Sequence, residues 1–146
     1  MKTRHAFLIL AVALSVFSCK KQLSATSSKK DLLTGKAWVV KKAEEKNNTE
    51  PWTDVFPLWD ACYKDNTWRF NADFTMEYNE AALACGADSP NQVLESSTWS
   101  FSDNETKITA DDVTYSIEQL DATTFVIVES ETVAGATSSR RVTFGH

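Results

Sequence analysis

The sequence predicts an all-β domain, an eight-stranded antiparallel up-and-down β-barrel, with a β-sandwich as the alternative. Apolar and polar residues alternate with a period of two in short segments such as 74–78 and 99–102, as expected for strands with one buried face. Turns rich in Asn and Asp separate these segments, and both residue types tolerate the left-handed backbone of tight hairpins. Short turns predict pairing in chain order, and closure into a barrel removes the exposed sheet edges.

The same alternation places the individual elements. A helical turn at about residues 31–34 precedes the first strand, and no longer helical periodicity stands out except within the two long connections. The strands are expected at about residues 36–43, 67–71, 73–79, 97–102, 105–110, 112–120, 123–130 and 138–144.

The N-terminus predicts a secretion signal over residues 1–18. It has a basic start and then an apolar run over residues 6–17, which is shorter than the roughly 20 residues that span a membrane. The signal ends in Val16-Phe17-Ser18-Cys19, which resembles the lipobox of bacterial lipoproteins. That resemblance implies a diacylglycerol on the Cys19 thiol, and the alternative is a secreted protein with an incidental cysteine.

The residue after Cys19 indicates where the anchored protein resides. By resemblance to lipoprotein sorting signals, an Asp there would retain the protein in the inner membrane, so Lys20 implies the outer membrane. No acidic run follows the cysteine, and we expect the periplasmic face. We expect residues 19–31 to form a lipidated, flexible tether and residues 32–146 to form one domain.

The charge distribution limits the partners. From Asp31 onward the chain carries 9 basic and 20 acidic residues, a net charge of −11. This excess argues against nucleic acid, which binds through cationic side chains. The tether carries four lysines, and each basic residue near an anionic membrane contributes about 1 kcal/mol of attraction. The membrane is therefore the expected partner of the tether.

Two cysteines remain in the domain, Cys62 and Cys85. An even pair in an oxidising compartment predicts a disulfide, and the alternatives are free thiols or a metal pair. The two histidines are His5, in the signal, and His146, the last residue, so a zinc site and a histidine base are not expected. We expect no enzyme activity, no cofactor and no metal.

The segment Leu33-Thr34-Gly35-Lys36-Ala37-Trp38 resembles the start of lipocalin-like, calycin-type domains. Residues 62–66, the strand after them and the turn at 71–73 resemble the small lipocalin-like domains of bacterial outer-membrane lipoproteins. In lipocalins the first-strand Trp plugs the closed barrel end beneath a basic residue from late in the chain. The resemblance implies such a plug from Gly35, Trp38 and either Arg140 or Arg141, and the parity of Arg140 with Phe144 favours Arg140.

Segment 44–66 is too long for a hairpin, and its stretch 51–59 carries three large aromatic residues and two prolines. It is a cover that completes the core, a lid over a pocket, or a docking patch for a partner. We expect a module for a small apolar or amphipathic ligand; the alternative is a filled barrel that binds or inhibits an envelope protein. The predicted ligand wall is Trp52, Phe56, Trp59, Tyr78, Trp99 and Tyr115.

We predict that Cys19→Ser abolishes the anchor, because serine has no thiol to accept the diacylglycerol, whose two acyl chains would hold the protein on the membrane. The variant should appear in the soluble envelope fraction without a lipid mass on intact-protein mass spectrometry, whereas a Ser18→Ala control stays in the membrane. Firm membrane retention of the Cys19→Ser variant would contradict the lipobox interpretation.

Overall fold

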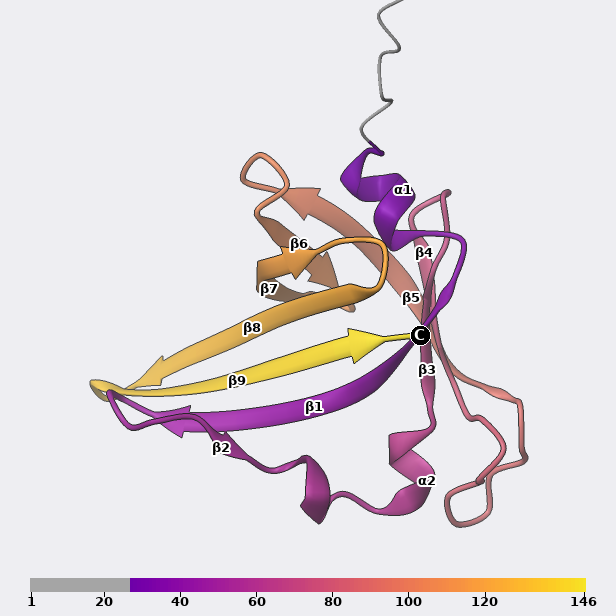
Figure 1. Cartoon of the computed structure of the whole chain (residues 1–146), viewed down its shortest axis with the longest axis horizontal. Helices are drawn as coiled ribbons and strands as arrows, with labels where there is room; N and C mark the ends of the chain where they lie inside the picture. The colour runs from indigo at the N-terminus through magenta and orange to yellow at the C-terminus, as the bar shows by residue number, and fades with distance from the viewer. Residues whose placement is uncertain (1–26) are drawn as a thin grey trace, which may run out of the picture.

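The computed structural model describes residues 27–146, so the predicted signal, Cys19 and most of the tether lie outside the described residues. The described chain forms one antiparallel sheet that closes on itself by pairing of the first and last strands (Figure 1). Eight strands form the barrel, as predicted, and the sandwich alternative is excluded; β2 is a small addition. The elements are α1 Lys29–Leu33, β1 Ala37–Asn47, β2 Thr53–Asp54, the 3₁₀ helix η1 Phe56–Leu58, α2 Ala61–Lys64, β3 Thr67–Phe70, β4 Thr75–Asn79, β5 Val93–Ser102, β6 Lys107–Ala110, β7 Val113–Leu120, β8 Thr124–Val133 and β9 Ala136–Gly145.

The barrel is up-and-down: β3 to β9 pair in chain order, and β1 lies between β3 and β9. The hairpin turns follow the predicted chemistry. Asp111 and Asp112 both have positive φ, 49° and 60°, between the paired residues Ala110 and Val113, as a two-residue hairpin requires. The predicted strand 73–79 begins later, at Thr75, because the residue before it takes φ 68° in the turn.

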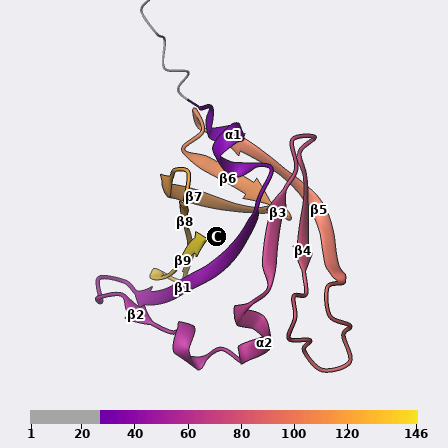
Figure 2. The ribbon, with the colours of Figure 1, turned by 45° about the vertical axis from the view of Figure 1, so that its right-hand side comes forward.

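The two ends of the barrel differ. The closed end carries the turns β3–β4, β5–β6 and β7–β8 and is covered by α1. The open end carries the β8–β9 turn and two long connections, residues 48–66 and 80–92. We call residues 48–66 the lid. In both views α1 and the lid lie on opposite sides of the barrel (Figures 1 and 2).

The lid enters the barrel wall where two strands separate. β1 pairs with β3 only over Ala37–Val39, and further along β1 the partner on that side is β2, at Glu44 and Glu45. A bulge between Val40 and Lys42 falls between these two stretches, and bulges increase local bending. The gap between β1 and β3 at the open end is therefore bridged by the lid.

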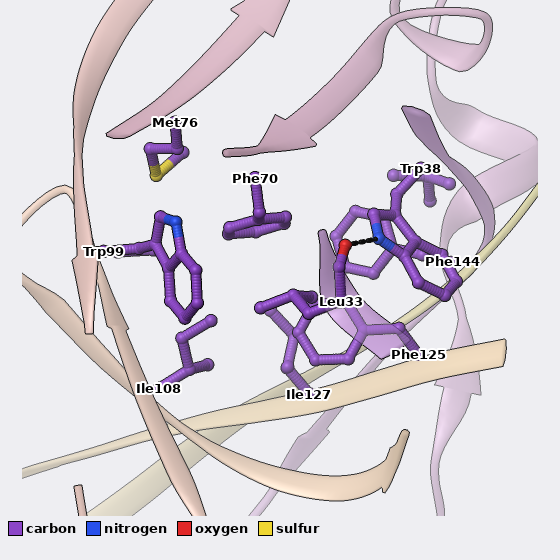
Figure 3. Close-up of a cluster of buried hydrophobic side chains, with 11 residues drawn as sticks. Leu33, Trp38, Phe70, Met76, Trp99, Ile108, Phe125, Ile127 and Phe144 are labelled. Atoms are coloured by element: carbon purple, nitrogen blue, oxygen red, sulfur yellow. Dashed lines mark hydrogen bonds between the residues drawn. The ribbon is translucent and has the colours of Figure 1, made fainter. Parts of the chain in front are cut away.

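The hydrophobic core fills the closed half of the barrel (Figure 3). Trp38 is fully buried, and its indole Nε1 donates to the Leu33 carbonyl at 2.8 Å. Leu33 ends α1, whose N-terminus is fixed by a reciprocal pair of hydrogen bonds between Ser28 and Asp31. The helix thus begins within the segment predicted as tether, because this capping pair nucleates it. The other core residues are Val40, Phe70, Met76, Trp99, Ile108, Ala110, Phe125, Ile127 and Phe144.

Trp38 occupies the predicted plug position, but the predicted arginine does not cover it. The Lys36 Nζ lies 4.7 Å from its ring centroid and the His146 ring stacks on it at 4.6 Å. Arg140 pairs across the ladder with Glu45, seven residues beyond Trp38 on β1 and therefore about 20 Å away at about 3.3 Å per residue. Its parity does turn it inward, but the strand register places it at the open end.

We predict that Trp38→Phe lowers the free energy of unfolding by roughly 2 kcal/mol or more, since it leaves a void and a buried carbonyl without its donor. Urea denaturation measures the change. Trp52→Phe is the matched control, because that ring lies on the outside of the barrel, and it should cost less than about 1 kcal/mol. Equal losses in the two variants would contradict the assignment of Trp38 as the central closed-end contact.

Candidate binding pocket

The open half of the barrel retains a pocket of about 170 Å³. Its walls are mostly aromatic and aliphatic, with a few polar groups at the edge. It is smaller than typical small-molecule sites, which begin at about 300 Å³, because the core side chains already fill the closed half. The lining residues are Val40, Trp59, Tyr63, Asn66, Trp68, Tyr78, Tyr115, Ile127, Glu129, Arg140, Val142 and Phe144.

Strand register explains why these side chains converge. Trp68 pairs with Tyr78 across β3–β4, and Ile127 pairs with Val142 across β8–β9. Directly paired residues point to the same face of a sheet, here the barrel interior. The lid contributes further wall through Trp59, which follows η1, and through Tyr63 and Asn66. The pocket is thus closed on one side by a segment that belongs to no barrel strand.

Three of the six predicted ligand-wall residues line the pocket, namely Trp59, Tyr78 and Tyr115. Phe56 lies behind Trp59 instead, with the two ring centroids 5.5 Å apart in an edge-to-face contact. Its role is to support the lid ring that does line the pocket.

Trp99 does not line the pocket, contrary to the prediction. Its side chain points inward, but it is 2 % exposed within the core. The indole Nε1 donates to the Asn71 carbonyl at 3.1 Å, and the ring lies edge-on to Phe70 with centroids 5.9 Å apart. Alternation identified the inward face correctly, but Trp99 lies too close to the closed end to reach the cavity.

Trp52 is also misplaced by the prediction, because it lies on the outside of the barrel. The Arg141 guanidinium and the Lys46 Nζ lie 4.4 and 4.6 Å from its ring centroid. Arg141 in turn binds the buried carboxylate of Glu44 at 2.7 Å. Burial of Glu44 tends to raise its pKa, but hydrogen bonds from Lys42 and Arg141 outweigh that effect and hold the pKa below its usual value. Trp52 therefore fastens the start of the lid to the barrel exterior.

The predicted disulfide is confirmed and joins the end of the lid to the connection 80–92. Cys62, in α2, bonds to Cys85, with their Cα atoms 5.3 Å apart, inside the range of about 4.4–6.8 Å that the bond requires. Buried Asn66 reinforces the link by accepting from the Ala81 N–H at 3.2 Å. The buried Glu80 carboxylate accepts from the Cys85 N–H at 3.2 Å. The open end is therefore held by covalent and polar contacts together.

Two of the three tyrosines that line the pocket, Tyr78 and Tyr115, report its electrostatics. Burial raises the pKa of the Tyr115 phenol, and the Glu129 carboxylate raises it further. Burial likewise raises the pKa of the Tyr78 phenol, which a hydrogen bond from Asn66 partly offsets, and the nearby Glu80 carboxylate adds to the increase. Both phenols are therefore held neutral in the physiological range.

Sequence reasoning missed Tyr63, Trp68, Glu129 and the aliphatic wall of the pocket. A signal for Glu129 was present, because it has the same parity as Phe125 and Ile127, which face inward. A carboxylate in an inward register near a barrel end indicates a solvated cavity, since a buried charge without one is costly. Tyr63 gave no such signal, because it lies on a helical turn of the lid.

The barrel, its closed-end Trp plug and its open-end pocket define a calycin-type binding fold. The model of the family described as the lipocalin-like domain matches residues 33–127 of this chain. The chain therefore belongs to the lipocalin-like domain family. No curated protein matches the chain.

Two further properties hold for the described part of the chain. None of its helices has the length and apolar character needed to cross a membrane. Among residues 27–146, no three His, Cys, Asp or Glu side chains gather in a way that could hold a metal ion.

We predict that replacing both Cys62 and Cys85 with Ser loosens the open end and lowers the free energy of unfolding by about 3–4 kcal/mol, since a loop of this length loses its covalent closure. Hydrogen exchange should accelerate in residues 53–66 and 80–92 but not around Trp38. Wild-type protein treated with a reductant should behave like the double variant. Unchanged exchange in the lid would show that the disulfide does not clamp it.

Proposed function

We propose that this chain is a lipid-anchored envelope lipoprotein whose barrel holds a small apolar or amphipathic ligand without transforming it. The observation that carries the proposal is the aromatic pocket at the open end, beneath a lid that a disulfide fastens. Family membership supports it, because the lipocalin-like barrel is a binding fold. The pocket side chains include no nucleophile paired with a base.

The size of the pocket limits the ligand. A volume of about 170 Å³ admits a small molecule, or one end of a longer one, rather than the drug-sized ligands that fill about 300 Å³ or more. The walls are flat rings on several sides, from Trp59, Trp68 and Tyr115. Flat, apolar groups such as a phenyl ring or a short alkyl chain match these walls best.

The position of α1 supports a defined orientation for an anchored protein. α1 covers the closed end, where the Lys29 ammonium donates to the Glu105 carbonyl in the β5–β6 turn, and the lid lies on the opposite side (Figure 2). A lipid on Cys19 would therefore hold the closed end toward the outer membrane. The pocket would then face the periplasm and take its ligand from the aqueous phase.

A second candidate function, docking of an envelope protein, has one observation in its favour. Leu58 in the lid is 82 % exposed, and Tyr63 beside it is 48 % exposed. Together with Trp59 and Asp60 they border a shallow surface depression. Apolar side chains displayed on a rigid lid are a feature of protein contacts.

We predict that Val142→Phe weakens binding of phenethyl alcohol at least about tenfold, because the larger side chain occupies the pocket. Titration followed by the indole N–H signals of Trp59 and Trp68 measures the affinity. Val133→Phe is the matched control, since Val133 is 63 % exposed at the β8–β9 hairpin, and it should bind as the wild type does.

Equal binding by the two Val→Phe variants, or no binding by the wild type, would contradict the ligand proposal. Capture of an envelope protein that survives Val142→Phe but is lost on Leu58→Asp would favour the docking function instead.

A further inference from the structure

A charged cleft adjoins the pocket at the rim of the barrel. This cleft has a volume of about 330 Å³ and is lined by Glu45, Glu129, Glu131, Ser138 and Arg140. Glu129 and Arg140 line both the cleft and the aromatic pocket, so the two spaces adjoin. A ligand in the pocket therefore has its outer end among these charges.

The only cationic side chain of the cleft lining is already engaged. The Arg140 guanidinium donates to Glu45 Oε1 through Nε at 3.0 Å and through Nη2 at 2.8 Å. Glu129 and Glu131 form no ion pair within residues 27–146. With three carboxylates and one guanidinium, the cleft carries a net negative charge, so it attracts cations and repels anions.

The negative field extends into the pocket from two sides. The carboxylates of Asp65 and Glu80 contribute to the raised pKa of Tyr78. Those of Glu129 and Asp111 contribute to the raised pKa of Tyr115, an effect that the Arg140 guanidinium partly offsets. In both cases burial is the larger cause. Glu80 is 2 % exposed, and its Oε2 has no hydrogen-bond partner in the described chain. Carboxylates thus lie near the phenols of both Tyr78 and Tyr115.

Arg140 lines the pocket, but among the described residues no cation lies over the face of a ring in its aromatic walls. Four aromatic rings of the described chain have a lysine ammonium over their face, and none of them lines the pocket. They are Trp38, Trp52, Phe56 and Phe74. The six lining rings have no such partner among the described residues; they are Trp59, Tyr63, Trp68, Tyr78, Tyr115 and Phe144. Rings in a low-dielectric pocket attract an ammonium group through their negative faces.

We propose that the ligand of this pocket is an amphipathic cation, a small molecule with an aromatic or short aliphatic body and a protonated or quaternary ammonium group. The body lies among the rings, and the ammonium lies at the junction with the cleft, next to Glu129. This inference rests on the proposed function, since it names the ligand class of the same pocket.

Three compounds that share a phenyl ring and a two-carbon arm test the charge preference: phenethylamine, phenethyl alcohol and phenylacetate. In titrations at neutral pH and low salt, phenethylamine should bind with the highest affinity, at least about fivefold above that of phenethyl alcohol. Phenylacetate should bind with the lowest affinity. A roughly tenfold increase in ionic strength should weaken the binding of phenethylamine only.

Glu129→Gln should lower the amine-to-alcohol affinity ratio by at least about threefold. Glu105→Gln removes the same charge at the closed end and should leave the ratio intact. A thermal melt verifies that the variants fold, and Glu131→Gln at the cleft serves as a second variant if Glu129→Gln does not.

The outcomes separate this inference from the function on which it rests. Alcohol or phenylacetate binding as tight as the amine overturns the cation preference and leaves the ligand pocket standing. No binding by any of the three compounds overturns both. An amine preference that persists in both the Glu129→Gln and Glu131→Gln variants overturns the assignment of the cleft carboxylates.

Discussion

The pairing of β1 with β9 is the constraint on which the other features depend. Its ladder runs from Val39 opposite Gly145 to Asn47 opposite Ser138, and it converts a meander of hairpins into a barrel. The same register assigns each inward side chain to a height within that barrel. Val40 lies beside Phe144 in the core, whereas Glu45 lies beside Arg140 at the open rim.

Core volume and pocket volume compete inside a barrel of this size. Bulky rings such as Trp38, Trp99 and Phe125 fill the closed half, and their burial at about 25 cal/mol per Å² supplies most of the stabilisation. The pocket persists only where β1 and β3 separate and the lid forms part of the wall. The polar residues at its edge are tolerated because they remain partly in water.

The sequence predicts faces and turns better than it predicts height along a strand. Period-two alternation placed Tyr115 and Arg140 on the inner face correctly, and paired aspartates identified the β6–β7 hairpin. Alternation carries no information on which barrel end a residue occupies. That depends on inter-strand register, and so Arg140 and Trp99 were assigned to the wrong ends.

The lid shows a second limit of sequence reasoning. The disulfide could be predicted, because two cysteines in an oxidising compartment have few alternatives. The different positions of Trp52, Phe56 and Trp59 could not be predicted, because aromatic residues on an irregular segment follow no periodicity that would indicate their orientation. Trp52 packs against the Arg141 guanidinium outside the barrel, whereas Trp59 lines the pocket.

The short strand β2 has a consequence for the behaviour of the protein in concentrated solution. Beyond Val39, β1 no longer pairs with β3 along one edge. An unpaired strand edge is a template for association with other chains. β2 pairs with this edge at Glu44 and Glu45, and the Val55 N–H donates to the Ala43 carbonyl at 2.8 Å. The exposed lysines at the adjoining bulge, Lys41 and Lys42, disfavour association of other chains with the remainder of this edge. Shortening the lid to a tight turn would therefore expose a strand edge and favour aggregation, even if the barrel itself stayed folded.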